Sequence, residues 1–198
     1  MDYSFEIVDS EQLYERFKKD IIQLEGEFWF WVYSTMNTLY PDDADYMFQK
    51  YIKKTMSQYL QEKEQERITG IPMPDTDTSQ KKFYSIPGNV TILLLVNNNP
   101  VARIGLEKVN NDRALVRKTF VKPEFRGRHF GDLLIDKTKE LALANNYTVL
   151  RLLTVDFMKS AIKLYLRTGF NYCEYENESI LTKEEAQSHG LSMELLLK

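Results

Sequence analysis

The sequence predicts a mixed α/β fold of the α+β type, with about seven strands in a mainly antiparallel sheet and about four flanking helices. Apolar residues alternate with polar ones, or form short apolar runs, in seven segments of the chain. In four other segments they recur every three or four residues, as in a helix with one buried face. Three of the strands follow one another over residues 90–121 with only short turns between them, which favours antiparallel pairing.

The N-terminal part is expected to begin with a strand and continue as two helices. Residues 3–7 alternate in the manner of a half-buried strand, and Ser10 is placed to cap a helix over residues 10–28. One continuous apolar stripe predicts a second helix over residues 42–67. The run at 28–33 is too aromatic for one helix face, so its rings either pack in a core, which we favour, or line a pocket.

A long loop is expected next, because residues 68–88 are rich in glycine, proline and small polar residues. Long loops in compact domains often shape a binding site, although plain flexibility explains the composition equally well. The rest of the chain divides into strands and helices. Strands are expected at 90–96, 101–109, 114–121, 149–154, 170–175 and 193–197, and helices at about 131–145 and 161–168.

Length, charge and cysteine content restrict the class of protein. A chain of 198 residues with 43% hydrophobic and 28% charged residues fits one domain with an ordinary polar surface. A net charge of −3 argues against nucleic-acid binding, and the absence of a signal peptide or membrane span predicts a cytoplasmic protein. Cys173 is the only cysteine and is expected to serve packing, and His129 and His189 lie far apart, so we expect neither a disulfide nor a metal site.

The most informative segment is a glycine-containing basic turn at residues 120–131, between a predicted strand and a predicted helix. Gly127 and Gly131 allow the backbone to approach a ligand closely, and the helix directs free N–H groups into the turn. Arg126, Arg128 and His129 add positive charge, which suits a diphosphate. The alternative is a basic turn with no ligand. The sequence lacks both the Walker phosphate loop and the dinucleotide-binding glycine pattern.

The turn resembles motif A of the Gcn5-related N-acetyltransferase (GNAT) family, in which an arginine or glutamine begins the motif and a glycine or alanine ends it. Arg126 and Gly131 occupy these ends, and His129 stands where the family usually has a glycine. A side chain at position 129 must therefore tolerate the conformation of the turn or point away from the phosphates. The sequence at 120–123, Phe-Val-Lys-Pro, is similar to the family's preceding strand, and residues 161–170 match its later Ala-x-x-Leu-Tyr-x-x-x-Gly-Phe pattern.

The resemblance implies a fold, a ligand and a set of binding residues. It implies a splayed pair of parallel strands at a site for acetyl-CoA, within a single domain over residues 1–198. Residues 88–175 would form the core of this domain, and residues 10–88 would shape the acceptor site. The residues implied in binding acetyl-CoA are Phe120, Val121, Arg126, Gly127, Arg128, His129, Phe130, Gly131 and Asp132.

The family pattern also implies how an acetyl group would be transferred to an amine. Tyr165 matches the tyrosine that protonates the departing thiolate, since a phenol pKa of about 10 lies above the thiol value of about 8.5. Without the resemblance, Tyr165 reads as a core ring. Some relatives carry acidic residues where this chain has Leu115 and Leu153, so Glu107 and Asp156 are the remaining candidates for the base, unless both are solvated surface carboxylates.

The sequence thus leads to an acetyl-CoA-dependent N-acetyltransferase that acts in a ternary complex on an unidentified amine, without a metal. The alternative is a catalytically weak acyl-CoA-binding or regulatory module of the same family. A monomer and a homodimer are both compatible with the sequence, and the acidic balance favours a cationic acceptor.

Overall fold

The computed structural model describes residues 2–47, 50, 53–176 and 189–198 of the chain. Its contacts divide into two compact units, of which one comprises Met1–Asp9 with Phe83–Lys198 and the other comprises Ser10–Lys82. The first unit contains the sheet, and the second is helical. The two units are described separately below.

The sheet has seven strands in the order β1-β2-β3-β4-β5-β7-β6, which confirms the predicted mixed fold. All neighbouring strands pair antiparallel except β4 and β5, which are parallel. The strands are β1 (Tyr3–Val8), β2 (Val90–Val96), β3 (Asn99–Lys108), β4 (Arg113–Val121), β5 (Val149–Val155), β6 (Asn171–Tyr172) and β7 (Gly190–Leu196). The strand expected at 170–175 is therefore only two residues long, and its pairing with β7 ends where the Cys173 N–H donates to the Ser192 carbonyl at 3.0 Å.

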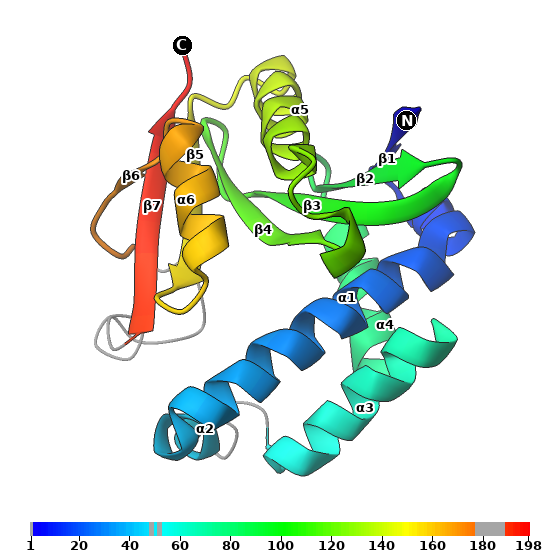
Figure 1. Ribbon diagram of the computed structural model, residues 1–198. Coiled ribbons are helices and arrows are strands. Elements are labelled where there is room, and N and C mark those ends of the chain that lie inside the picture. Colours follow the sequence, from blue (N-terminus) through cyan, green and yellow to red (C-terminus); the bar gives the residue numbers. More distant parts are fainter. Residues whose placement is uncertain (1, 48–49, 51–52, 177–188) are drawn as a thin grey trace. The chain divides into compact units, whose positions relative to one another are not determined.

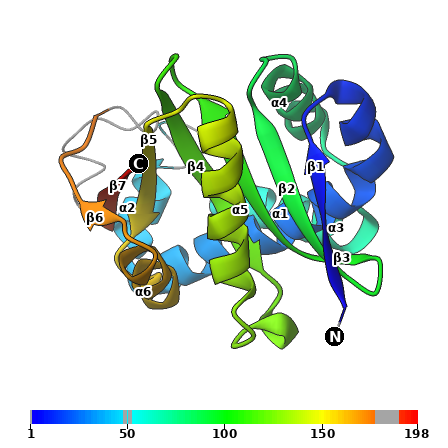
Figure 2. The ribbon, with the colours of Figure 1, turned by 90° about the horizontal axis from the view of Figure 1, so that it is seen from above.

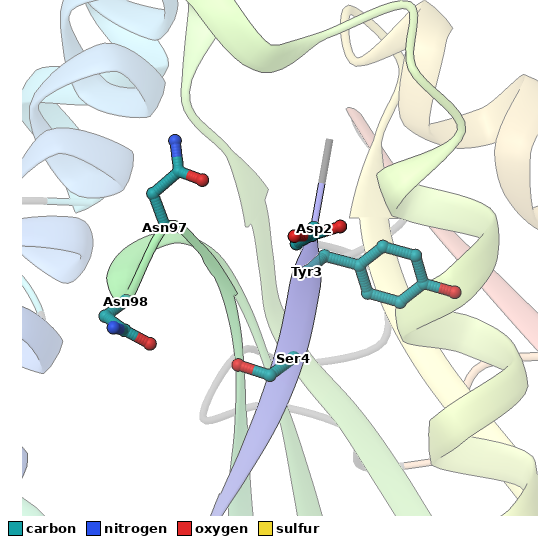
Figure 3. Close-up of a pocket in the computed structure, with 5 residues that line it drawn as sticks. All are labelled: Asp2, Tyr3, Ser4, Asn97 and Asn98. Atoms are coloured by element: carbon teal, nitrogen blue, oxygen red, sulfur yellow. The ribbon is translucent and has the colours of Figure 1, made fainter.

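The β2–β3 connection is the tight turn that its asparagines predict. Asn97 and Asn98 both have positive φ, 51° and 62°, as a two-residue hairpin turn matched to the twist of the strands requires. Asn tolerates this conformation better than most other non-glycine residues. Beside this turn lies a shallow polar hollow of about 340 Å³, lined by Asp2, Tyr3, Ser4 and the two asparagines (Figure 3). None of the binding or catalytic residues expected from the sequence lines it.

The parallel strands β4 and β5 pair along only part of their length. Arg113, Ala114 and Leu115 of β4 oppose Val149, Leu150 and Arg151 of β5, and no further pairs follow. Beyond this point the two strands diverge (Figure 1). The splayed parallel pair is therefore present, and the C-terminal half of β4 turns an unpaired edge towards β5.

A β-bulge interrupts β4 within this diverging half. Between the pairs Arg103↔Phe120 and Gly105↔Arg117, β3 contributes one residue, whereas β4 contributes Lys118 and Thr119. Lys118 adopts a positive φ of 52°, which accommodates the extra residue. The bulge shifts the alternation of side chains along the strand, so that residues after it exchange faces relative to a regular strand.

Two helices pack against one face of the sheet through a shared apolar core. Helix α5 (Phe130–Ala144) lies against β2, β3 and β4 (Figure 2). Helix α6 (Lys159–Arg167) contributes Leu164 and Tyr165 to the same core cluster. At Gly131 the two helices meet closely, since a Cβ atom there would lie 2.8 Å from Cδ2 of Leu164.

The helical unit consists of α1 (Glu11–Leu39), α2 (Pro41–Met47), α3 (Met56–Thr69) and α4 (Pro74–Tyr84), the last extending just past the boundary at Lys82. Ser10 caps α1 as expected, accepting a hydrogen bond from the Leu13 N–H at 3.4 Å. Helices α1 and α3 approach closely at Gly26, where a Cβ atom would lie 2.7 Å from the backbone nitrogen of Arg67. This contact explains why a glycine stands in the middle of a long helix.

Three expectations for this part of the chain are wrong. The aromatic run at 28–33 does not separate two helices but lies inside α1, where its rings contact several neighbours. The helix expected over 42–67 is interrupted at residues 53–55, because Lys53 has a φ of 60° and Thr55 begins α3 with a capping box to Gln58. Part of this segment, residues 48–49 and 51–52, lies outside the described residues.

The expected loop at 68–88 is the third difference, because it contains α4. This helix begins with a proline and has acidic residues in its first turn and lysines in its last, which suits the helix dipole. Its polar composition gives no apolar stripe of the kind that predicted the other helices. The aromatic residues at its end, Phe83 and Tyr84, are the exception.

Candidate functional site

The basic turn between β4 and α5 has the backbone geometry of an anion site. After β4 ends at Val121, Pro123–Phe125 form one 3₁₀ turn, and Gly127 follows with a φ of 74°. A Cβ atom on Gly127 would contact nothing within 4 Å, so the positive φ, and not space, favours glycine there. His129 then begins α5 in the left-handed conformation.

The first turn of α5 offers backbone donors to a ligand. The side chain of His129 makes no capping hydrogen bond, and the first helical bond here runs from the Leu133 N–H to the His129 carbonyl at 3.1 Å. Within the described part of the chain, no backbone carbonyl accepts a hydrogen bond from the N–H groups of Phe130, Gly131 and Asp132. These amides and the positive end of the helix dipole point into the turn.

Two arginines beside the turn supply positive charge. Arg126 donates from Nε to the Val121 carbonyl at 3.0 Å, and its guanidinium lies 5.8 Å from the centre of the Phe120 ring. The guanidinium of Arg128 lies 5.6 Å from the centre of the Phe125 ring. Both side chains are exposed. The aromatic contacts position the two charges beside the turn.

His129 and Asp132 form a small ionic group with Arg167 of α6. The His129 side chain is 84% exposed, and its Nδ1 lies 3.3 Å from Oδ2 of Asp132. Asp132 accepts two hydrogen bonds of 2.7 Å from Arg167, and these hold the pKa of its carboxyl below the usual value. His129 therefore tolerates the conformation of the turn and turns its ring towards Asp132. The resulting ion pair joins the start of α5 to the end of α6.

Tyr165 lies in the core cluster on the α5 and α6 face of the sheet. It is 6% exposed, and its ring packs edge-on against Phe170 at 5.7 Å between ring centres. Burial raises the pKa of its phenol, and an interaction with the Thr119 side chain acts in the opposite direction. The phenol is therefore protonated at neutral pH, as a proton donor must be.

Thr119 is a residue that the sequence did not single out. Its hydroxyl oxygen is buried, and no group in the described part of the chain forms a hydrogen bond with it. The signal that points to it is indirect. Val116 and Val121 both pack in the core cluster although they are five residues apart. Residues at an odd spacing lie on opposite faces of a regular strand, so their shared face indicates a bulge between them.

The two base candidates lie in different places. Glu107 of β3 forms an ion pair with Arg117 of β4 and stands opposite Leu115, at the paired end of β4 and β5. Asp156 follows the last residue of β5, at the diverging end. Its Oδ2 lies 3.7 Å from Nδ1 of His189, and its backbone N–H donates to the His189 carbonyl at 2.9 Å. The structure therefore does not bring Glu107 and Asp156 together.

The two leucines that stand at positions acidic in some relatives are both sheet residues. Leu115 is buried, and Leu153 is half-buried opposite Ser192 of β7. In the described ranges no three histidine, cysteine or acidic side chains converge on a possible metal position. None of the helices described is both long enough and apolar enough to span a bilayer.

Comparison with known proteins relates both the sequence and the fold to one group. Residues 19–170 match the family model described as acetyltransferase (GNAT) family. No curated protein matches the chain. An acetyltransferase from Streptococcus agalactiae is similar in structure, with a TM-score of 0.60 and 16% identity over 98% of both chains.

Two further crystal structures are similar over nearly the whole chain. A GNAT acetyltransferase from Staphylococcus aureus has a TM-score of 0.59 and 18% identity, over 98% of this chain and 100% of that one. The PaiA N-acetyltransferase of Thermoplasma acidophilum, solved in complex with coenzyme A, has a TM-score of 0.59 and 16% identity, over 98% and 99%. At these identities the likeness demonstrates a shared fold.

Proposed function

This chain belongs to the GNAT family of acetyltransferases, and we propose that it transfers the acetyl group of acetyl-CoA to a primary amine by direct attack in a ternary complex. The observation that carries this proposal is the open edge of β4, which leads into the basic turn at the start of α5. A strand edge and a ring of backbone amides suit the two polar parts of CoA, its amide-containing arm and its pyrophosphate.

The residues of the turn fit the pyrophosphate in charge and in donor geometry. The N–H groups of Phe130, Gly131 and Asp132 would bind phosphate oxygens, and Gly127 lets the backbone approach them. Arg126 and Arg128 would neutralise the phosphate charge. The backbones of Phe120 and Val121, on the diverging half of β4, would pair with the amides of the pantetheine arm. His129 and Asp132 would act through the backbone, because their side chains face each other.

Acetyl-CoA supplies the thioester whose C–S bond breaks as the C–N bond to the amine forms. Tyr165 would donate its proton to the departing thiolate, for which its buried and protonated phenol is suited. Asp156 and Glu107 are the candidates for accepting the proton of the amine. Asp156 lies at the diverging end of β5, whereas Glu107 is engaged with Arg117, so we favour Asp156. Residues 10–88 would shape the acceptor site, as expected from the sequence.

The direct test measures CoA thiol release from acetyl-CoA in the presence of a panel of primary amines that includes polyamines, amino acids and a lysine peptide. At least one amine should stimulate release above the rate of hydrolysis. Acetyl-CoA at about 100 times its Kd should stabilise the fold by about 2.7 kcal/mol, visible as a rise in Tm. If acetyl-CoA leaves Tm unchanged, CoA binding is refuted.

Tyr165→Phe tests the acid separately, because it keeps the ring and removes the hydroxyl. We expect kcat to fall about 100-fold, at the lower end of the range for acid catalysis because a thiolate is a good leaving group. The rise in Tm with acetyl-CoA should persist. An unchanged kcat in this variant would exclude Tyr165 as the acid.

One observation favours a second candidate function, a catalytically weak acyl-CoA-binding module. Leu115 and Leu153 place apolar side chains where some relatives carry acids, so this chain lacks both of these bases. Such a module would keep the turn and bind acetyl-CoA. Binding without amine-dependent thiol release across the whole panel would support it over the enzyme.

A further inference from the structure

The bulge in β4 determines which side chain faces Tyr165. Ala114 and Val116 before the bulge belong to the core cluster that contains Tyr165, and Val121 after it packs against the same cluster. Thr119 is two residues before Val121 and therefore shares its face. In a strand without the extra residue, the sequence position of Thr119 would instead direct it to the opposite face, away from Tyr165.

The Thr119 hydroxyl on this face has unused hydrogen-bonding capacity within the described residues. Thr119 Oγ1 is buried without a partner among the described residues, as noted above, and the Tyr165 side chain is buried in the core cluster on the same face. Buried hydroxyls without partners are uncommon, because each loses its hydrogen bonds to water. Burial raises the pKa of the Tyr165 phenol, and the Thr119 side chain acts in the opposite direction, as a hydroxyl close to the phenol oxygen does.

We propose that Thr119 is a positioning residue, whose hydroxyl donates a hydrogen bond to the Tyr165 oxygen and directs the phenolic proton towards the thioester sulfur. The proposal rests on the proposed acetyltransferase function. A phenol has one proton to donate, so an incoming O–H from Thr119 leaves that proton for the ligand. The same bond stabilises negative charge on the phenol oxygen as the proton leaves.

The proton balance of the step is complete. The amine nitrogen attacks the carbonyl carbon, the C–S bond breaks, and the phenolic proton of Tyr165 moves to sulfur to give free CoA thiol. The Tyr165 phenolate keeps the hydrogen bond from Thr119. The proton lost by the amine nitrogen passes to the base, for which Asp156 is favoured above, and from there through solvent back to the phenolate, so no oxidant, reductant or further reactant is required.

The test uses two variants of nearly the same shape. Thr119→Val keeps the branched side chain and removes the hydroxyl, whereas Thr119→Ser keeps the hydroxyl. We expect Thr119→Val to lower kcat about tenfold, with the KM for acetyl-CoA within about twofold, and Thr119→Ser to retain most of the activity. In the Tyr165→Phe background, Thr119→Val should cause no further loss, because the two residues act as one unit.

A second readout is independent of turnover. The ¹³Cζ resonance of Tyr165, assigned with Tyr165→Phe, should shift on addition of CoA in the wild type and in Thr119→Ser, and should shift less in Thr119→Val. Equal shifts in all three proteins would refute the positioning role. So would a kcat of the Thr119→Val, Tyr165→Phe double variant that falls by the product of the two single losses. Failure of acetyl-CoA to raise Tm would refute the proposed function itself, which distinguishes the two failures.

Discussion

His129 and Gly127 occupy the same left-handed region of backbone conformation within one short turn, yet only one of them is a glycine. A non-glycine residue with φ near 60° is strained by about 1 kcal/mol relative to glycine. Part of the stability gained by placing glycine there is offset, because glycine has more conformational entropy in the unfolded chain. We therefore expect His129→Gly to leave the free energy of unfolding unchanged or to raise it by up to about 1 kcal/mol. Acetyl-CoA binding should be retained.

Gly127→Ala is the matched control for that prediction, because it introduces the same strain where no steric contact exists. Its free energy of unfolding should fall by up to about 1 kcal/mol, because the less flexible unfolded chain of alanine offsets part of the strain. Urea denaturation of both variants beside the wild type measures the changes. Changes of equal sign at the two positions would contradict the strain argument.

The ion pair between Asp132 and Arg167 should contribute a pH-dependent part of stability. In the folded protein the pKa of Asp132 is lowered, chiefly by Arg167. The stabilisation is therefore complete above the ordinary aspartate pKa of about 3.9, and it disappears as the pH falls through the lowered pKa of the folded protein. Because Arg167 is half-exposed, Arg167→Met should lower the free energy of unfolding at pH 7 by only about 0.5 kcal/mol.

Urea denaturation at several pH values measures this difference. It should shrink towards zero as the pH falls from the ordinary aspartate pKa of about 3.9 through the lowered pKa of Asp132. Arg167→Met should have a smaller effect at neutral pH in the Asp132→Asn background than in the wild type. In that background Arg167 has no charged partner at position 132 that the substitution could remove. A difference that stays constant from pH 7 to pH 2.5 would show that Arg167 stabilises through packing alone.

At the scale of elements, the close approach of α1 and α3 at Gly26 is the contact most sensitive to a single methyl group. A Cβ atom there meets backbone atoms of Lys63 and Arg67, at 2.8 and 2.7 Å, which a side-chain rotation cannot relieve. We expect Gly26→Ala to lower the free energy of unfolding by about 2 kcal/mol, despite the better helix propensity of alanine. Asn37→Ala, exposed in the same helix, is the control and should change it by less than about 0.5 kcal/mol.

The sequence was sufficient for the sheet and for the turn before α5, because both depend on local signals. Asn97 and Asn98 favour a hairpin turn, and the basic glycine turn precedes an apolar helix stripe. The break before α3 was not visible, since the Thr55 capping box interrupts an apolar stripe that continues on both sides. Helix α4 was missed because charged residues at its ends stabilise it without producing a stripe.

Within the candidate site, the sequence indicated Tyr165 and the turn but not Thr119. Residue patterns along β4 assume strict alternation, and one extra residue at Lys118 and Thr119 reverses it. A bulge of this kind depends on how β3 and β4 pair, which is a long-range property. Likewise, the contact of His129 with Asp132, and of Asp132 with Arg167, requires two helices to meet.

For the whole molecule, both tryptophans lie in the helical unit, at positions 29 and 31 of α1, whereas the proposed CoA site lies in the sheet unit. Tryptophan fluorescence therefore probes the helical unit directly. If the chain is one cooperative domain, as its length predicts, acetyl-CoA should raise the fluorescence-detected Tm by the same amount as the Tm from far-ultraviolet circular dichroism. A fluorescence-detected Tm that does not change on addition of acetyl-CoA would show that the two units unfold separately.

The pairing of β1 with β2 has a consequence for synthesis on the ribosome. Tyr3 pairs with Val96, and the whole helical unit, Ser10–Lys82, is translated between them. At a translation rate of about 5–20 residues per second, β1 is made on the order of several seconds before β2. The residues of the helical unit are made in this interval and can already form their contacts with one another. Strand β1 thus stays unpaired until β2 has been made, and until then its apolar side chains are exposed to chaperones.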